Sequence, residues 1–178
     1  MALILLRHTA PDIEPGICYG QTDVKVAQDF EADAAKVFES LPRVRQIVSS
    51  PLVRCRKLAD YLASRLELES KEDAGLMEID FGAWELQAWS DIPRAEIDAW
   101  AADFFNARPH GGESVAMLNA RVRASLRNWS HSDEHTLIIT HAGVIRAALS
   151  TGDTAEDFDR QIAFGDFVTL SPTLGTVI

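Results

Sequence analysis

Two continuous apolar runs in the chain predict strands that are buried on both faces. They are Ala2–Leu6, with the sequence ALILL, and Thr136–Thr140, with the sequence TLIIT. Apolar runs of this length are typical of strands in a parallel sheet that helices cover on both sides. Shorter segments predict further strands at Gln46–Ser49, Glu67–Lys71, Phe167–Leu170 and Leu174–Ile178, the last two on either side of a turn at Pro172.

Between these strands, apolar residues recur at helical spacing. They predict helices over Val26–Leu41, around Ile97–Phe105, over Val115–Trp129 and over Gly143–Leu149. A further helix is predicted to end at Leu66, with Ser50 as its N-cap and Pro51 as its first helical residue. The segment Gly75–Ser90 is predicted to be a long ordered loop. Strands that alternate with helices predict an α/β fold with a mostly parallel sheet. The sequence has no repeat and no linker-like stretch, which favours one domain over residues 1–178.

Composition narrows the function classes. The 178 residues are 47% hydrophobic and 25% charged, which is typical of a globular protein. The net charge of −10 and the lack of a basic run argue against a nucleic-acid partner. The five apolar residues before Arg7 are too few for a signal peptide or a membrane span, so a cytoplasmic protein without a membrane partner is expected. Cys18 and Cys55 suit neither a disulfide framework nor a zinc site, and no nucleotide-binding glycine motif is present.

The candidate chemistry lies where the predicted strands end. His8 follows the first buried strand, with Arg7 beside it, and His141 follows TLIIT. Arg54 falls in the first turn of the helix that begins near Ser50, and Glu78 lies in the long loop. Ligands of an open parallel sheet bind beyond the carboxyl ends of its strands, so we expect these side chains to converge there.

This set of residue types suits phosphoryl transfer. Guanidinium groups bind phosphate oxygens in pairs, and a neutral imidazole can attack phosphorus to form a covalent intermediate. A second imidazole, if protonated, stabilises charge on the transferring group. A glutamic acid can protonate the leaving oxygen and then, as a carboxylate, activate water.

Five motifs, in this order, resemble those of the histidine phosphatase superfamily, the phosphoglycerate mutase-like group. They are Leu6-Arg7-His8, Ser49–Cys55, Glu78–Glu85, Gly111–Ser114 and Thr140–Gly143, and they cover residues from 7 to 143. The resemblance implies a three-layer α/β/α sandwich and no metal or other cofactor. It also implies that His8 is the phosphorylated nucleophile, that Glu78 is the proton donor, and that Arg7, Arg54 and His141 form the phosphate pocket. Gln21, in the segment Gly20–Asp23, matches a position of the family that is expected to bind phosphate.

Two positions depart from the family pattern. Thr9 stands where glycine usually follows the nucleophile, and a β-branched residue tolerates a positive φ poorly. Glu14 stands near a usual asparagine, and because a carboxylate repels phosphate, we expect it to point away from the site. These departures bear on the substrate more than on the catalytic class.

Other conspicuous residues have simpler interpretations. Trp84 and Trp89 are expected to pack within the loop rather than stack on a substrate, and Glu113 and Ser114 to begin the helix Val115–Trp129. Cys55 is expected in the core. Three further histidines have polar neighbours and are expected to be solvated: His110, His131 and His135.

The function predicted from the sequence is hydrolysis of a small phosphorylated metabolite by a metal-independent phosphomonoesterase. Within the family, Tyr19–Asp23 and the short chain look most similar to the α-ribazole phosphatase branch, whose substrate is α-ribazole 5'-phosphate. A phosphoglycerate mutase is the nearest alternative, although such mutases tend to be longer. A catalytically silent phospholigand-binding protein and a phosphohistidine protein phosphatase are further alternatives. The first is disfavoured by the complete reactive set, and the second by Glu78. The sequence does not indicate an oligomeric state.

Overall fold

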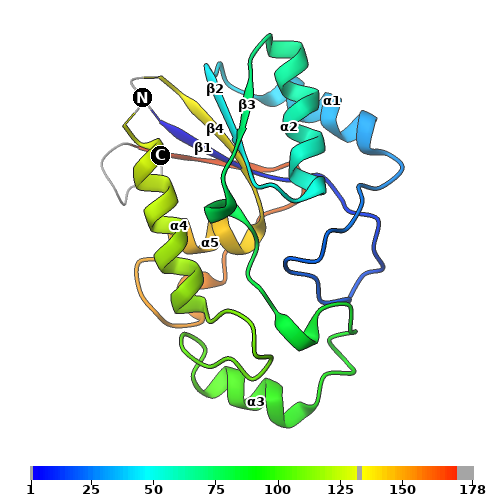
Figure 1. Ribbon diagram of the computed structural model, residues 1–178, viewed down its shortest axis with the longest axis vertical. Coiled ribbons are helices and arrows are strands. Elements are labelled where there is room, and N and C mark those ends of the chain that lie inside the picture. The colour runs from blue at the N-terminus through cyan, green and yellow to red at the C-terminus, as the bar shows by residue number, and fades with distance from the viewer. Residues whose placement is uncertain (1, 132–133, 172–178) are drawn as a thin grey trace.

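A five-stranded sheet forms the centre of the computed structural model, which describes residues 2–131 and 134–171. Its strands are β1 (Leu3–Arg7), β2 (Gln46–Ser49), β3 (Ser70–Glu72), β4 (Thr136–Thr140) and β5 (Phe167–Leu170). Their order is β3-β2-β4-β1-β5, and all neighbouring pairs are parallel except β1 with β5 (Figure 1). The two apolar runs of the sequence, β1 and β4, are therefore paired neighbours near the middle of the sheet.

Helices cover both faces of the sheet, as a three-layer α/β/α sandwich requires. The helices α1 (Phe30–Ser40) and α2 (Val53–Leu66) lie on one side, and α4 (Val115–Trp129) and α5 (Ala142–Leu149) on the other (Figure 1). Successive residues of a strand point to opposite faces. In β1, Ile4 and Leu6 pack in the α1/α2 core, while Leu3 and Leu5 pack in the α4/α5 core. The continuous hydrophobicity of ALILL is explained by these two cores.

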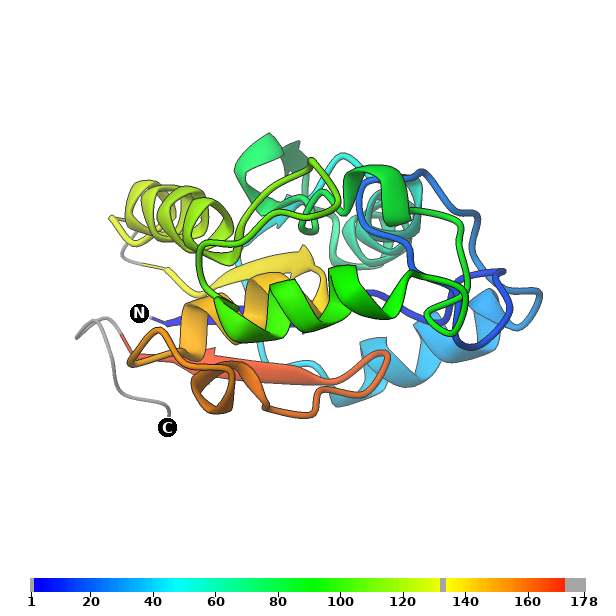
Figure 2. The same ribbon diagram turned by 90° about the horizontal axis from the view of Figure 1, so that it is seen from below.

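The segment between β3 and α4 extends beyond the carboxyl edge of the sheet. It contains two short 3₁₀ turns, Ala74–Leu76 and Gly82–Trp84, and the helix α3 (Arg94–Ala102); a third 3₁₀ turn, Glu156–Phe158, follows α5. Seen from below, α3 lies in front of the sheet (Figure 2). The predicted ordered loop is thus confirmed, and Trp84 packs within it at 1% exposure beside Cys18 and Ile92.

Asp73 ties the beginning of this segment to α4. Its carboxylate accepts hydrogen bonds from the Gly75 backbone N–H at 2.7 Å, the Ser125 hydroxyl at 2.5 Å and the Trp129 indole N–H at 2.6 Å. Burial alone raises the pKa of Asp73, but the three hydrogen bonds outweigh burial and lower it. The ionised carboxylate therefore stabilises the start of the loop.

Several predicted element ends were wrong, each for a local reason. The helix predicted from Val26 begins at Phe30, because the Val26 backbone forms an isolated antiparallel bridge with Pro11. The predicted third strand begins at Ser70, because Glu67 ends α2 in the left-handed conformation, with φ of 54°. The helix predicted around Ile97–Phe105 ends at Ala102.

The N-cap prediction at Ser50 was also wrong. The Ser50 N–H donates to the Ile139 carbonyl at 2.9 Å, which continues the pairing of β2 with β4, and α2 begins only at Val53. The bounds of β2, β4, β5 and α4 match the predicted ones, and α5 begins one residue earlier than predicted. The strand predicted at Leu174–Ile178 lies outside the described residues.

His110 is not solvated, contrary to the expectation from its polar neighbours. It is 3% exposed, its ring lies 4.7 Å from that of Trp84, and its Nδ1 accepts the Gly112 N–H at 3.1 Å. His131 and His135 are exposed as expected. Among the helices of the described residues, none is long and apolar enough to cross a membrane.

Replacing a core leucine of α2 tests the two-core architecture. Leu58 has 0% exposure in the core between the sheet and α1/α2, so Leu58→Ala is expected to lower the free energy of unfolding by about 2–5 kcal/mol. Met117 is 47% exposed on α4, so Met117→Ala is expected to change it by less than about 0.5 kcal/mol. Urea denaturation measures both, and equal losses would contradict this packing.

Candidate active site

The pairing of β1 with β4 brings the two predicted histidines together. Arg7 pairs with Thr140, and the His8 N–H donates to the Thr140 carbonyl at 3.0 Å. The residues that follow the two strands therefore leave the sheet side by side. The centroids of the His8 and His141 rings lie 5.2 Å apart, with an interplanar angle of 63°. The predicted convergence of both imidazoles at the carboxyl edge is thus confirmed.

His8 is held as one tautomer by its own backbone. Its Nδ1 lies 2.7 Å from the Thr9 carbonyl oxygen, and because a carbonyl can only accept, Nδ1 carries the proton. The lone pair of Nε2 is then free to act as a nucleophile. Burial lowers the pKa of His8 to about 3, and the charges of Arg54 and Arg7 contribute in the same direction, while the Thr9 hydrogen bond opposes them. His8 is therefore neutral at physiological pH.

His141 lies at the N-terminus of α5 and is fully buried. Its Nε2 lies 2.8 Å from the Ser50 hydroxyl and 3.4 Å from the Cys55 sulfur. Burial holds the pKa of His141 well below its usual value, and electrostatic coupling to the His8 ring and the charge of Arg54 act in the same direction. The imidazole is thus neutral before an anion binds, and its protonated role requires the negative charge of a bound phosphate. Cys55 is a core residue as predicted, with 0% exposure, and burial raises the pKa of its thiol.

Arg54 is buried at the start of α2, with 0% exposure. Its Nη1 donates to the Thr22 carbonyl at 2.9 Å and its Nη2 to the Gly20 carbonyl at 2.6 Å. A cation at a helix N-terminus opposes the helix dipole, so these carbonyls stabilise an otherwise unfavourable position. The same bonds fasten the loop around Gln21 over the carboxyl edge of the sheet.

Arg7 is the last residue of β1 and directly precedes His8. Its Nη1 donates to the Ile162 carbonyl at 2.6 Å, and its guanidinium carbon lies 3.7 Å from the centroid of the Phe164 ring. Phe164 is 43% exposed, and its ring centroid lies 5.6 Å from that of His8. Phe164 therefore forms part of the outer wall of the site.

Three buried donors around His8 have no hydrogen-bond partner among the described residues. They are Arg7 Nε, Arg54 Nε and the Thr9 hydroxyl. Buried polar groups are normally paired, and an oxyanion next to His8 would satisfy donors of this kind. The residue types and their placement thus fit an anion, and the Thr9 hydroxyl is a candidate that the sequence reasoning missed.

Gln21 lies in a loop that is fastened to the segment carrying Glu78. The Gln21 side-chain amide donates to the Glu78 carbonyl at 3.1 Å, and its backbone N–H donates to the Glu85 carboxylate at 2.9 Å. The Thr22 N–H and hydroxyl also donate to Glu85. The approach is close, since a Cβ on Gly20 would lie 2.0 Å from the Ile79 carbonyl oxygen. Gln21 is thus near the site, and its amide N–H holds the loop.

The Glu78 carboxylate points toward the first turn of α5. Its Oε2 accepts the Gly143 N–H at 3.1 Å, and its Oε1 accepts the Ile79 N–H at 2.9 Å. A Cβ at position 143 would lie 2.1 Å from Glu78 Oε1, so this approach requires the glycine. Glu78 also interacts electrostatically with Arg7. The predicted acid therefore lies beside the first turn of α5 and within electrostatic reach of Arg7.

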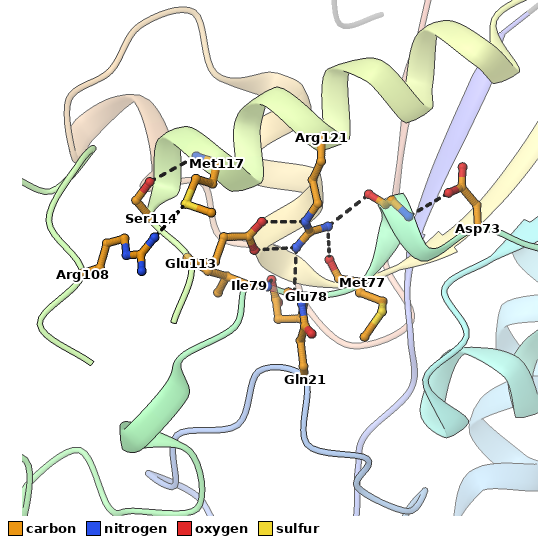
Figure 3. Close-up of polar contacts among 11 residues, drawn as sticks. Gln21, Asp73, Met77, Glu78, Ile79, Arg108, Glu113, Ser114, Met117 and Arg121 are labelled. Carbon is orange, nitrogen blue, oxygen red and sulfur yellow. Dashed lines mark hydrogen bonds and ion pairs between the residues drawn. The ribbon is translucent and has the colours of Figure 1, made fainter. Parts of the chain in front are cut away.

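Arg121 and Glu113 hold the backbone that carries Glu78 (Figure 3). Arg121 donates to the carbonyls of Gly75, Met77 and Glu78 at 3.1, 2.7 and 2.9 Å, and to both Glu113 carboxylate oxygens at 2.8 Å. Ser114 is the N-cap of α4, as predicted, but Glu113 serves this ion pair. Glu113 lies in the motif Gly111–Ser114, whereas nothing in the sequence pattern indicates a role for Arg121.

The two departures from the family pattern are accommodated locally. The positive-φ non-glycine residues of the described chain are Glu67 and Leu86, so Thr9 does not need the backbone freedom of glycine. Glu14 is exposed, in agreement with a carboxylate that points away from the site. Within residues 2–131 and 134–171, no group of three or more His, Cys, Asp or Glu side chains is arranged to hold a metal ion.

Comparison with known proteins gives one consistent family. A family model described as the histidine phosphatase superfamily (branch 1) matches residues 3–163. An adenosylcobalamin/alpha-ribazole phosphatase from Salmonella typhimurium (strain LT2) is 27% identical over 164 residues, covering 82% of this chain and 76% of that protein. Several curated relatives are named as phosphoglycerate mutases or mutase-like proteins, and the aligned parts cover 68% and 65% of the length of two of them.

Solved structures agree with the fold along nearly the whole chain. A phosphoglycerate mutase from Thermus thermophilus has a TM-score of 0.78 at 27% identity, covering 100% of this chain and 96% of that one. A mycobacterial glucosyl-3-phosphoglycerate phosphatase in complex with VO3 has a TM-score of 0.83 at 27% identity, covering 96% and 92%. The central sheet flanked by helices is thus phosphoglycerate mutase-like, as predicted.

The tautomer and charge of His8 are directly measurable. Because burial lowers its pKa to about 3, we expect His8 to stay neutral, with the proton on Nδ1, from pH 8 down to about pH 5. Nitrogen-15 NMR of the imidazole rings reports both properties. A His8 titration near pH 6.5 would contradict this site geometry.

Proposed function

Because the chain belongs to the histidine phosphatase superfamily, we propose that it is a metal-independent phosphomonoesterase whose His8 carries the phosphoryl group. The observation that supports this most is the neutral imidazole of His8. Its Nδ1 is bound to the Thr9 carbonyl, which leaves Nε2 unprotonated, and the guanidinium groups of Arg54 and Arg7 are close enough to act on it electrostatically. A neutral imidazole with a free lone pair is a nucleophile, and the adjacent cations attract the phosphate it attacks.

In the first step, His8 Nε2 forms a bond to phosphorus while the ester P–O bond breaks. Glu78, protonated at this stage, transfers its proton to the departing oxygen and becomes a carboxylate. The phosphorylated imidazole keeps its Nδ1 proton, and the Thr9 carbonyl stabilises the positive charge that develops on the ring.

In the second step, water replaces the alcohol. The Glu78 carboxylate removes a proton from water as its oxygen attacks phosphorus, and the N–P bond breaks so that the lone pair returns to His8. Arg7, Arg54 and His141 stabilise the equatorial oxygens in both steps, and the anion itself raises the proton affinity of His141. The Glu78 carboxylate is held for this role by the Gly143 and Ile79 N–H groups.

Access to the nucleophile runs past partly buried side chains. His8 is 1% exposed and His141 is 0% exposed, whereas Arg7, Gln21 and Glu78 are partly exposed. The Phe164 ring over Arg7 lies on the solvent side. We infer that substrate enters between these groups and that binding displaces the Phe164 ring.

As the substrate we propose α-ribazole 5'-phosphate or a similar small metabolite ester. Support comes from the similarity to the Salmonella alpha-ribazole phosphatase and from the Tyr19–Asp23 segment that binds Arg54. Phosphoglycerate mutase-type transfer is the second candidate, because a Thermus mutase matches the whole chain. Release of inorganic phosphate from α-ribazole 5'-phosphate, without interconversion of phosphoglycerates, would favour the phosphatase over the mutase. A cytoplasmic location stays a prediction.

Trapping the phosphoenzyme tests the proposed nucleophile. Rapid mixing with labelled 4-nitrophenyl phosphate in EDTA is expected to give an acid-labile phosphoenzyme in the wild type and none in His8→Ala. His131→Ala, which alters an exposed histidine, is the matched control and is expected to label normally. Label that persists in His8→Ala would show that another residue is the nucleophile. Turnover that depends on added Mg²⁺ would contradict the proposed metal-independent chemistry.

The leaving-group dependence of a Glu78 variant tests the proposed acid. Glu78→Gln keeps the shape of the side chain and can still accept one of the two backbone N–H groups, but it cannot donate an acidic proton. Hydrolysis of ethyl phosphate is expected to fall by about 10²–10⁴-fold, whereas hydrolysis of 4-nitrophenyl phosphate, whose leaving oxyanion is stable, falls far less. Steady-state kcat/KM for the two esters measures this difference. Equal losses would assign the proton to another donor.

A further inference from the structure

A cavity of about 370 Å³ lies next to the segment that carries the proposed acid. Its apolar wall includes Ile79, Phe81, Trp100, Phe104, Val115 and Phe158. We call it the aromatic pocket. Its volume falls within the range of small-molecule sites, about 300–1,000 Å³.

The aromatic pocket and the phosphate-binding side chains share one wall. Gly143, whose N–H binds the Glu78 carboxylate, lines the pocket, and so does Ile79, the residue after Glu78. Arg146, one helical turn beyond Gly143, also lines it. Burial is the main cause that lowers the pKa of Arg7, and the charge of Arg146 lowers it further, so the two cations are within electrostatic reach.

The proton transfer fixes where the alcohol part of a substrate must lie. Its oxygen has to stand between phosphorus at His8 and the Glu78 carboxylate. The remainder of the alcohol then extends past Glu78 and Gly143, which is the direction of the aromatic pocket. The pocket is therefore the space available to the leaving group.

The chemistry of the wall selects among leaving groups. Trp100, Phe104 and Phe158 form successive ring contacts, with centroids 5.4 Å and 5.6 Å apart, and they offer ring faces and edges to a flat occupant. The Trp100 indole nitrogen is buried and has no hydrogen-bond partner among the described residues, so one donor is available to an oxygen of the occupant.

The charged residues of the pocket disfavour an anionic leaving group. Exposed Glu156 and Asp159 line it together with Arg146, whose Nε already donates to the Arg160 carbonyl at 2.9 Å. These three side chains, two carboxylates and one guanidinium, carry a net charge of −1, which disfavours a carboxylate or a second phosphate in the pocket.

We propose that the aromatic pocket binds the leaving group and selects phosphate esters of uncharged alcohols that carry an aromatic ring. This inference rests on the proposed hydrolysis at His8 and names its substrate class.

Four alkyl esters, compared in two pairs, test the selectivity, because each releases an alkoxide that needs the same protonation. For the wild type, kcat/KM is expected to be at least about tenfold higher for 2-naphthylmethyl phosphate than for ethyl phosphate. The ester of 4-carboxybenzyl alcohol is expected to be poorer than benzyl phosphate. Comparable values within both pairs would overturn the proposal while leaving the hydrolysis intact.

Phe104→Ala is expected to reduce the naphthyl-to-ethyl ratio about tenfold, mainly through KM. Phe38→Ala is the matched control, since Phe38 is partly buried in the opposite core, and its ratio is expected to match that of the wild type. If Phe104→Ala does not fold, Phe104→Leu replaces it with a smaller expected loss. A ratio that is unchanged in the folded Phe104 variant would contradict the pocket assignment.

A binding measurement separates the hypothesis that His8 hydrolyses phosphate esters from the hypothesis that the aromatic pocket binds the leaving group. Titration with 2-naphthylmethanol is expected to shift the NMR signals of the Trp100 indole, and Phe104→Ala is expected to weaken this binding. The measurement needs no turnover, so a protein that binds the alcohol but hydrolyses no ester would refute only the proposed function. Hydrolysis without binding, and without selectivity, would refute only the pocket.

Discussion

The parallel hydrogen bonding between β1 and β4 is the constraint on which the rest of the site depends. It joins strands that lie more than a hundred residues apart in the sequence, and it aligns Arg7 with Thr140. Because the strands are parallel, both chains leave the sheet at the same edge, and the imidazoles of His8 and His141 meet there. A shift of one residue would exchange the two faces of β1 and remove one histidine from the site. The two cores, through Ile4 and Leu5, hold this alignment in place.

Burial sets the charge states of the site residues, and it also destabilises the folded protein at these positions. Arg54 is a fully buried cation at a helix N-terminus, and both histidines are kept neutral by the same lack of solvent. Such positions destabilise the fold unless other groups compensate, which the Gly20 and Thr22 carbonyls do in part. The positive charge that these carbonyls do not compensate makes the site favour a bound anion, although the protein as a whole is acidic. In the proposed mechanism a dianionic ester relieves this imbalance, so the proposed affinity for phosphate and the low pKa of His8 have one physical cause.

Local patterns in the sequence predicted the parts of this structure that depend on local forces. The buried run TLIIT and the amphipathic period of Val115–Trp129 were sufficient to predict β4 and α4 with their observed bounds. Side-chain roles that depend on distant contacts were missed. Ser50 resembles an N-cap, but the pairing of β2 extends through its N–H, and its hydroxyl lies against His141. His110 has polar neighbours in the sequence, yet Trp84, twenty-six residues earlier, buries it. Arg121 lies on α4, and the amphipathic pattern of that helix does not predict that its side chain binds three carbonyls of another segment.

Those carbonyls also explain why the acid and the proposed leaving-group pocket form one unit. Arg121 holds the backbone from Gly75 to Glu78, and the chain that continues from it supplies Ile79 and Phe81 to the pocket wall. A displacement of this segment would therefore move the proton donor and reshape the pocket together. The arrangement links specificity to catalysis, because an alcohol that fills the pocket packs against the same backbone that aims the Glu78 carboxylate. An ester with a small leaving group still contacts the phosphate-binding cations but lacks this packing, so its transition state receives only part of the available stabilisation.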